Sequence, residues 1–182
     1  MEQIRRIKRE ILARGAITTY CRDTMLLPDG KTADWDLVDH NGAAAIVAVH
    51  EDGRLILVRQ YRNALERETI EIPAGGLNRN PDGSKEDTKL AALRELKEET
   101  GYEAQDAKLL LSIYTTVAFC NEKIDIYLAT GLKRHGAQHL DEDEYVNVEY
   151  YTLEALQKKI FACEIQDAKT VAGILAYAAK NN

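Results

Sequence analysis

The sequence predicts an α/β (α+β) protein in which helices cover a mixed β-sheet, preceded by an N-terminal antiparallel β-hairpin region. The segments "AAAIVAVH" and "RLILVRQY" meet at "EDGR", and their dense apolar runs indicate a hairpin of strands buried on both faces. An earlier pair, residues 16–27 and 32–39, flanks the turn "PDGK". Strands and helices then mix without the regular alternation of a parallel βαβ fold, which favours a mixed sheet.

The remaining elements follow from local patterns along the chain. Ile4, Ile7, Ile11 and Leu12 have helical spacing in a short basic stretch, so the chain begins with either a helix or an arm leading into the first strand. After "ETIEIPAGG" and the polar loop "LNRNPDGSK" comes a glutamate-rich segment. Downstream we expect strands near 108–114, 123–130 and 145–151, and helices at about 152–160 and 167–180.

Composition limits the class of protein. A chain of 182 residues with 45% hydrophobic content can form one main core and at most a small appendage. The net charge of -6 argues against broad binding to nucleic acid or to an anionic membrane, so local cations or metal ions must hold any acidic ligand.

The cysteines and the N-terminus indicate a compartment. Cys21, Cys120 and Cys163 are scattered and odd in number, which fits neither a disulfide framework nor a zinc site and points to a reducing environment. The N-terminal "MEQIRRIKREILARG" is too charged for a signal peptide, and no later segment is long enough to span a bilayer. We therefore expect a cytoplasmic protein.

The glutamate-rich segment predicts a helix over residues 85–100. Ser84 can cap it, with Asp87 three residues on, and Gly101 suits the left-handed position just past its end. Leu90, Ala91 and Leu93 supply an apolar stripe.

Three glutamates of this helix share one face. Glu95, Glu98 and Glu99 are related by i+3 and i+4, so their carboxylates lie close together, and Arg94 alone cannot neutralise all three. Such a cluster is either a solvated acidic face or a site for a hard cation such as Mg²⁺, which prefers oxygen ligands.

The motif around these glutamates resembles the Nudix box. Glu86, seven intervening residues and "RELKEETGY" match every fixed position of its closing part, E-x7-R-E-U-x-E-E-x-G-U, where U is bulky or aliphatic. The box should open with a glycine where this chain has Asn80, so we read Gly75 or Gly76 as that glycine and "NRNPDGSK" as containing a loop insertion. The stretches "VRQYRNALERETIEIPAGG", "FCNEKIDIYLATGL" and "DEDEYVNVEYYTLEAL" are similar to those of nucleoside diphosphate sugar hydrolases, especially ADP-ribose pyrophosphatases.

This resemblance implies a fold, a cofactor and a set of ligands. It implies a Nudix α/β/α sandwich with a mixed sheet over residues 41–182, after a β region over 1–40 that forms a dimer. It implies Mg²⁺ as cofactor, with Mn²⁺ as a possible substitute. The metal ligands that it implies are Glu95, Glu98, Glu99 and the backbone carbonyl of Ala74.

Catalytic roles are carried over in the same way. The resemblance implies that Arg94 and Glu86 orient the ligand carboxylates. It points to Glu142 or Glu144, in "HLDEDEYV", as the general base that closes over the substrate and positions or deprotonates water, although this stretch can equally be a solvated acidic loop.

Two residues are candidates for substrate binding. Arg62 matches the position that contacts the diphosphate or ribose in the resembled group, and a guanidinium suits that geometry. Trp35 lies in "TADWDLV", which resembles a segment whose tryptophan stacks on adenine across a dimer interface. It therefore either belongs to a core or stacks on adenine in a homodimer with composite sites.

The sequence therefore predicts a Mg²⁺-dependent pyrophosphohydrolase that cleaves ADP-ribose or a related nucleoside diphosphate sugar to a nucleoside monophosphate and a sugar phosphate. Hydrolysis of GDP-mannose or another NDP-sugar is the alternative within enzymes. A module that senses ADP-ribose without cutting it is the alternative outside them.

Overall fold

The computed structural model describes residues 3–140 and 145–181. The chain divides into two compact units. The first contains the chain up to Gly42 together with Tyr114–Lys123, and the second contains Ala43–Ile113 and Ile124–Asn182. The sequence analysis assigned Tyr114–Lys123 to the second region, so the first unit is discontinuous in sequence.

The first unit is built on an antiparallel sheet of three strands in the order β1-β2-β3. These strands are β1 (Arg5–Arg14), β2 (Thr18–Leu26) and β3 (Thr32–His40). Tyr114–Lys123 attaches to β3 through the Val38 amide, which donates to the Phe119 carbonyl over 2.7 Å. The first apolar segment is thus a strand and not a helix. The β1–β2 register shifts between Arg6 and Lys8 and again between Ile11 and Ala13, so this strand departs from strict alternation.

The second unit contains a mixed sheet in the order β12-β5-β4-β10-β9, with β6 paired to β5 and β7 paired to β4. Strand β4 runs parallel to β10 and antiparallel to β5 and β7, which confirms the predicted class. A separate pair joins β8 (Tyr102–Glu103) to β11 (Lys133–Arg134). The strands of the large sheet are β4 (Ala43–Val49), β5 (Leu55–Arg62), β6 (Arg67–Glu71), β7 (Ala74–Gly76), β9 (Lys108–Tyr114), β10 (Lys123–Ala129) and β12 (Val146–Tyr151).

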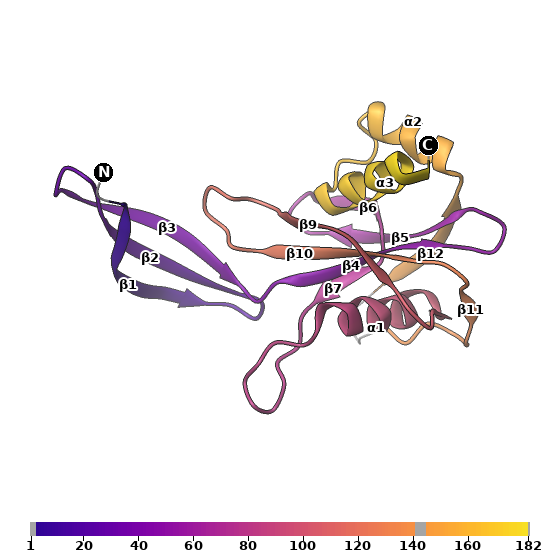
Figure 1. The fold of residues 1–182 in the computed structure, drawn as a ribbon, viewed down its shortest axis with the longest axis horizontal. Coiled ribbons are helices and arrows are strands. Elements are labelled where there is room, and N and C mark those ends of the chain that lie inside the picture. Colours follow the sequence, from indigo (N-terminus) through magenta and orange to yellow (C-terminus); the bar gives the residue numbers. More distant parts are fainter. Residues whose placement is uncertain (1–2, 141–144, 182) are drawn as a thin grey trace. The chain divides into compact units, whose positions relative to one another are not determined.

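Helices cover both faces of this sheet. Figure 1 shows α1 (Thr88–Thr100) on one side, and α2 (Leu153–Phe161) and α3 (Ala168–Asn181) on the other. Strand β4 separates two apolar clusters, because Ala44 and Ile46 pack with α1 whereas Ala45 and Val47 pack with α2 and α3. The result is the predicted α/β/α sandwich. No helix in the described part of the chain is long and apolar enough to cross a membrane.

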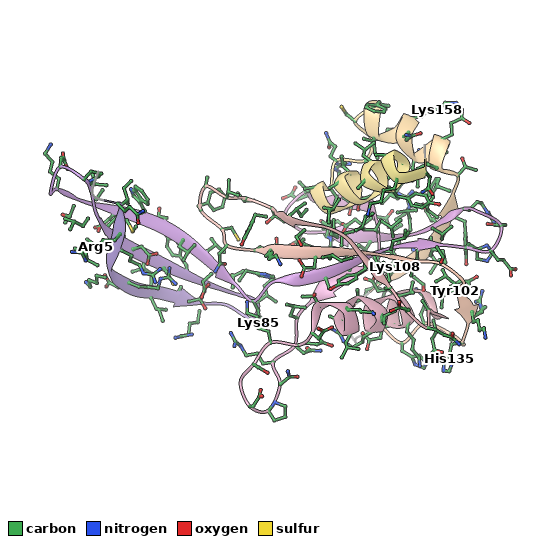
Figure 2. All side chains as sticks on the ribbon, in the orientation of Figure 1. Arg5, Lys85, Tyr102, Lys108, His135 and Lys158 are labelled. Atoms are coloured by element: carbon green, nitrogen blue, oxygen red, sulfur yellow. The ribbon has the colours of Figure 1, made fainter. Side chains whose placement is uncertain are left out.

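Helix α1 begins later than the sequence predicts. Its N-cap is Asp87, whose side chain accepts from the amides of Lys89 and Leu90, and not Ser84. The Ser84 hydroxyl instead donates to Asp82 within the preceding loop. The predicted end is confirmed, since Gly101 has φ 72° and its amide donates to the Lys97 carbonyl. Lys85 precedes this helix and Tyr102 follows it (Figure 2).

Candidate active site

The three glutamates of α1 differ in their surroundings. Glu95 and Glu99 are buried, with 8% and 3% of their surface exposed, whereas the Glu98 side chain is 39% exposed. A solvated acidic face does not fit this arrangement, because two of the three carboxylates lie between the helix and the sheet. Burying carboxylates is costly unless charge or hydrogen bonds compensate them.

The segment Ala74–Gly75 lies against these buried carboxylates. A Cβ atom at Gly75 would fall 2.0 Å from Glu95 Oε1, so only glycine lets the carboxylate approach the backbone so closely. The Ala74 amide donates to Glu99 Oε2 over 3.1 Å. Strand β7 therefore forms one wall of the site and α1 the other. This arrangement brings Ala74 next to the glutamates, where the sequence analysis expected it.

Arg94 joins the glutamates from the side. Its Nη1 donates to Glu95 over 2.7 Å and to Glu98 over 2.8 Å, while Nε and Nη2 each lie 3.1 Å from the oxygens of Glu86. Burial disfavours the charged guanidinium, but the bonds to Glu86 and the charge of Glu95 outweigh this effect and raise the pKa of Arg94. The same contact with Arg94 lowers the pKa of Glu86.

The donor set fits a hard divalent cation. Carboxylate oxygens from neighbouring turns of one helix face a backbone segment, and oxygen ligands are those that Mg²⁺ prefers. Within the described residues, no three acidic, His or Cys side chains already converge as a metal site does. Arg94 Nη1 pairs with both Glu95 and Glu98, so the guanidinium supplies positive charge between these two carboxylates.

The chain that leads to residues 141–144 is anchored at the C-terminal end of α1. The His139 amide donates to the Glu98 carbonyl over 2.9 Å, and Gln138 Nε2 donates to the Glu99 carbonyl over 2.6 Å. Gln138 Nε2 also donates to the Val146 carbonyl, which follows residues 141–144 in the sequence. Tyr102 and His135 lie at this same end of the helix (Figure 2). Glu142 and Glu144 themselves lie outside the described residues.

Arg62, at the end of β5, pairs with a residue that the sequence analysis did not single out. Its Nε and Nη2 donate to the two oxygens of Glu71 over 2.7 and 2.6 Å, and Glu71 is 2% exposed. Burial favours the neutral acid, but Arg62 and Lys169 outweigh it and lower the pKa of Glu71 to about 2. The sequence held one signal that could have identified Glu71: it is a glutamate in the apolar stretch "IEIP", where an unpaired buried charge would be costly and a cationic partner is therefore expected.

Trp35 belongs to the first unit. It lies on β3 opposite Asp23 of β2 and is 47% exposed, so it is not a core residue. It lines a cavity of about 840 Å³ together with Met25, Leu37 and Phe119. The core alternative for Trp35 is therefore wrong.

Residues 39–172 match the NUDIX domain. The chain belongs to this family. Among curated relatives, "ADP-ribose pyrophosphatase" of Bacillus subtilis is 39% identical over 168 residues, which cover 92% of this chain and 88% of the relative. The "ADP-ribose pyrophosphatase" of Mycobacterium tuberculosis is 35% identical, covering 93% and 81%. A "Methanol dehydrogenase activator" of Bacillus methanolicus is 39% identical, covering 92% and 89%.

The Nudix fold is also matched in three dimensions. The solved structure described as "Crystal structure of ADP compounds hydrolase" superimposes with a TM-score of 0.83, covering 98% of this chain and 94% of that one. The sequence identity is 23%, so this likeness concerns the fold alone.

Proposed function

We propose that this Nudix protein is a Mg²⁺-dependent pyrophosphohydrolase that cleaves the diphosphate of ADP-ribose to a nucleoside monophosphate and a sugar phosphate. The observation that carries the proposal is the pair of buried carboxylates, Glu95 and Glu99, held against Ala74–Gly75 on a complete closing part of the Nudix box. Two relatives that share 39% and 35% of their residues with this chain are named for ADP-ribose, which supports this substrate.

The residues that would hold the metal are Glu95, Glu98, Glu99 and the Ala74 carbonyl, with Mn²⁺ as a possible substitute for Mg²⁺. When bound, such a cation neutralises charge that develops on the phosphate oxygens and lowers the pKa of the attacking water. Arg94 and Glu86 orient the metal ligands. Glu86 holds the Arg94 guanidinium, and Arg94 in turn donates to the carboxylates of Glu95 and Glu98 and fixes the direction in which they point.

The remaining steps belong to the chain's other side chains. Arg62 donates to the diphosphate and orients it. Glu142 or Glu144 positions water and accepts its proton, so that the oxygen can attack phosphorus. The anchored flanks support this role, because the His139 amide donates to the Glu98 carbonyl of α1. The Gln138 side chain donates to both the Glu99 carbonyl and the Val146 carbonyl, and so links the two flanks of the acidic segment to α1.

Assembly and location complete the proposal. The protein is a cytoplasmic homodimer in which Trp35 stacks on the adenine bound by the partner copy, with no nucleic acid or membrane as partner. The exposure of Trp35 and its place beside an apolar cavity support stacking. The described cysteines are free thiols, which agrees with a reducing compartment.

Two other functions compete with this one. A different NDP-sugar, such as GDP-mannose, uses the same diphosphate chemistry. A sensing module that binds ADP-ribose without cutting it has no need of the acidic cluster on α1, and all three glutamates are retained here.

A substrate panel tests the proposal. ADP-ribose, GDP-mannose and other NDP-sugars are incubated with Mg²⁺, and the products are identified by mass spectrometry. We expect AMP and ribose phosphate from ADP-ribose at the highest kcat/KM. A higher kcat/KM for another sugar would replace the substrate, and binding of ADP-ribose without any turnover would favour the sensor.

A further inference from the structure

Glu71 lies at the centre of a buried polar network in the second unit. Besides Arg62, its carboxylate accepts from the Thr69 hydroxyl over 2.5 Å and from Lys169 of α3. Lys169 also donates to Asp167 over 3.0 Å and is itself buried. Four donors from three elements thus converge on one carboxylate, which fixes both of its oxygens in place.

The network reaches the wall of the active site. Thr170 of α3 accepts from the Ile72 amide over 2.9 Å, directly beside Glu71. Two residues further on, the Ala74 amide donates to Glu99. The segment from Glu71 to Ala74 is therefore held by α3 on one side and by α1 on the other. The hydrogen bonds to Glu71 raise the pKa of Arg62, and the charge of Glu99 adds to this effect.

The Arg62 guanidinium has capacity left for a ligand. Its side chain is 42% exposed although that of Glu71 is 2% exposed. Nε and Nη2 donate to Glu71, whereas Nη1 has no hydrogen-bond partner among the residues that the structure describes. Because the guanidinium is planar, fixing one edge also fixes the direction of the other.

Stability alone gives little reason to bury this carboxylate. Desolvating a charge costs several kcal/mol, and a well-packed apolar residue often serves a core equally well. Arg59 on the same strand shows the contrast. It makes a similar forked contact with Glu149, over 2.6 and 3.2 Å, but that carboxylate is 27% exposed.

We propose that Glu71 is a positioning residue for substrate binding: clamped by Thr69 and Lys169, it holds the Arg62 guanidinium in the orientation that receives the substrate diphosphate. This inference rests on the proposed function, because it takes a diphosphate as the ligand. Glu71 does not touch substrate, and its contribution passes through Arg62.

A double-mutant cycle between Glu71→Gln and Arg62→Met tests the coupling. In Glu71→Gln the guanidinium is no longer held, so we expect KM for ADP-ribose to rise about tenfold, the upper end of the cost of ordering one flexible side chain. Turnover should stay within about twofold, because an interaction made equally in ground and transition states affects KM alone. In the Arg62→Met background, Glu71→Gln should change KM no further.

Two more variants separate positioning from folding. Thr69→Val keeps the side-chain volume and removes one hydrogen bond to Glu71, so it should fold and raise KM about two- to threefold, the effect of roughly half a kcal/mol. Glu149→Gln breaks the forked pair of Arg59 and should leave KM unchanged. A rise in KM for Glu149→Gln equal to that for Glu71→Gln, or additive effects in the cycle, would overturn the inference.

Binding without turnover separates this inference from the proposed function. The dissociation constant of ADP-ribose is measured calorimetrically in EDTA for the same variants. If the wild type binds but never hydrolyses ADP-ribose, the proposed function fails, while the same non-additive cycle in the dissociation constant would support the positioning role. A wild type that neither binds nor hydrolyses it would overturn both.

Discussion

Glu98 is the exposed member of the glutamate cluster, and this makes it the clearest test of the proposed metal site. Its carboxylate accepts from Arg94 and lies at the open edge of α1, whereas Glu95 and Glu99 are buried. Glu98→Gln should lower turnover at least about 10²-fold, since one interaction that stabilises the metal is worth several kcal/mol in the transition state. The fold should survive, because removing like charge does not destabilise a helix.

The measurement is kcat for ADP-ribose with Mg²⁺, together with thermal unfolding. Glu103→Gln is the control. Glu103 is a surface carboxylate just beyond the end of α1, and it pairs with Lys97 of that helix. Near wild-type turnover in Glu98→Gln would contradict the assignment of Glu98 as a metal ligand.

Gly75 tests the backbone wall of the same site. In Gly75→Ala the new Cβ would lie 2.0 Å from Glu95 Oε1, so the carboxylate has to move. A displacement of this kind at a catalytic site can cost about 10²-fold in rate, and we expect a loss near that size in turnover with Mg²⁺. Gly76→Ala is the matched control, since a Cβ there meets nothing within 4 Å. Equal rates in the two variants would show that Glu95 does not need its present position.

At the scale of elements, most boundaries could be predicted because their signals are local. Gly101 marks the end of α1, and the strand predicted at 108–114 is β9. The start of α1 could not be placed, since Ser84 and Asp87 are both good caps and only the loop contacts decide between them. Strand β1 was ambiguous for a different reason: its apolar residues lack the alternation typical of a strand, and its pairing with β2 contains two register shifts.

The C-terminal end of α1 gives a prediction about an element junction. Gly101 has φ 72°, and a Cβ there would lie 2.5 Å from the Gly136 carbonyl. Gly101→Ala therefore combines backbone strain of about 1 kcal/mol with displacement of the chain around Gly136, which leads to residues 141–144. Gly53→Ala has a similar φ of 84° but meets nothing within 4 Å, so it isolates the strain.

The two variants are compared by free energy of unfolding and by kcat. We expect Gly101→Ala to lose more stability than Gly53→Ala, and to lower turnover as well if Glu142 or Glu144 acts as base. A smaller loss for Gly101→Ala than for Gly53→Ala would contradict the packing of Gly136 on the helix end.

At the scale of the whole molecule, the sequence could not reveal contacts between distant residues. Glu71 and Lys169 are separated by 98 positions, and Arg59 and Glu149 by 90. No local pattern pairs such residues, because their meeting depends on which strand lies beside which. The glutamates of the box could be found because their spacing on one helix is itself the signal. Gln138, which spans from α1 to β12, lies in a stretch without such a signal.

In the proposed homodimer, Trp35 links assembly to substrate choice. Because 47% of its surface is exposed, Trp35→Ala should not carry the roughly 3 to 5 kcal/mol cost of an aromatic residue removed from a core. If Trp35 stacks on adenine, the variant should instead raise KM for ADP-ribose by an amount near the roughly 1 to 3 kcal/mol of a base–aromatic stack. KM for an NDP-sugar with a smaller pyrimidine base should change less.

Tyr20→Ala is the control, since Tyr20 is an exposed aromatic residue on the opposite face of the same sheet. Light scattering should give a dimer for the wild type and for both variants. A Trp35→Ala protein that is monomeric or unfolded, while its folded fraction keeps a normal KM, would assign Trp35 to assembly and not to the nucleotide.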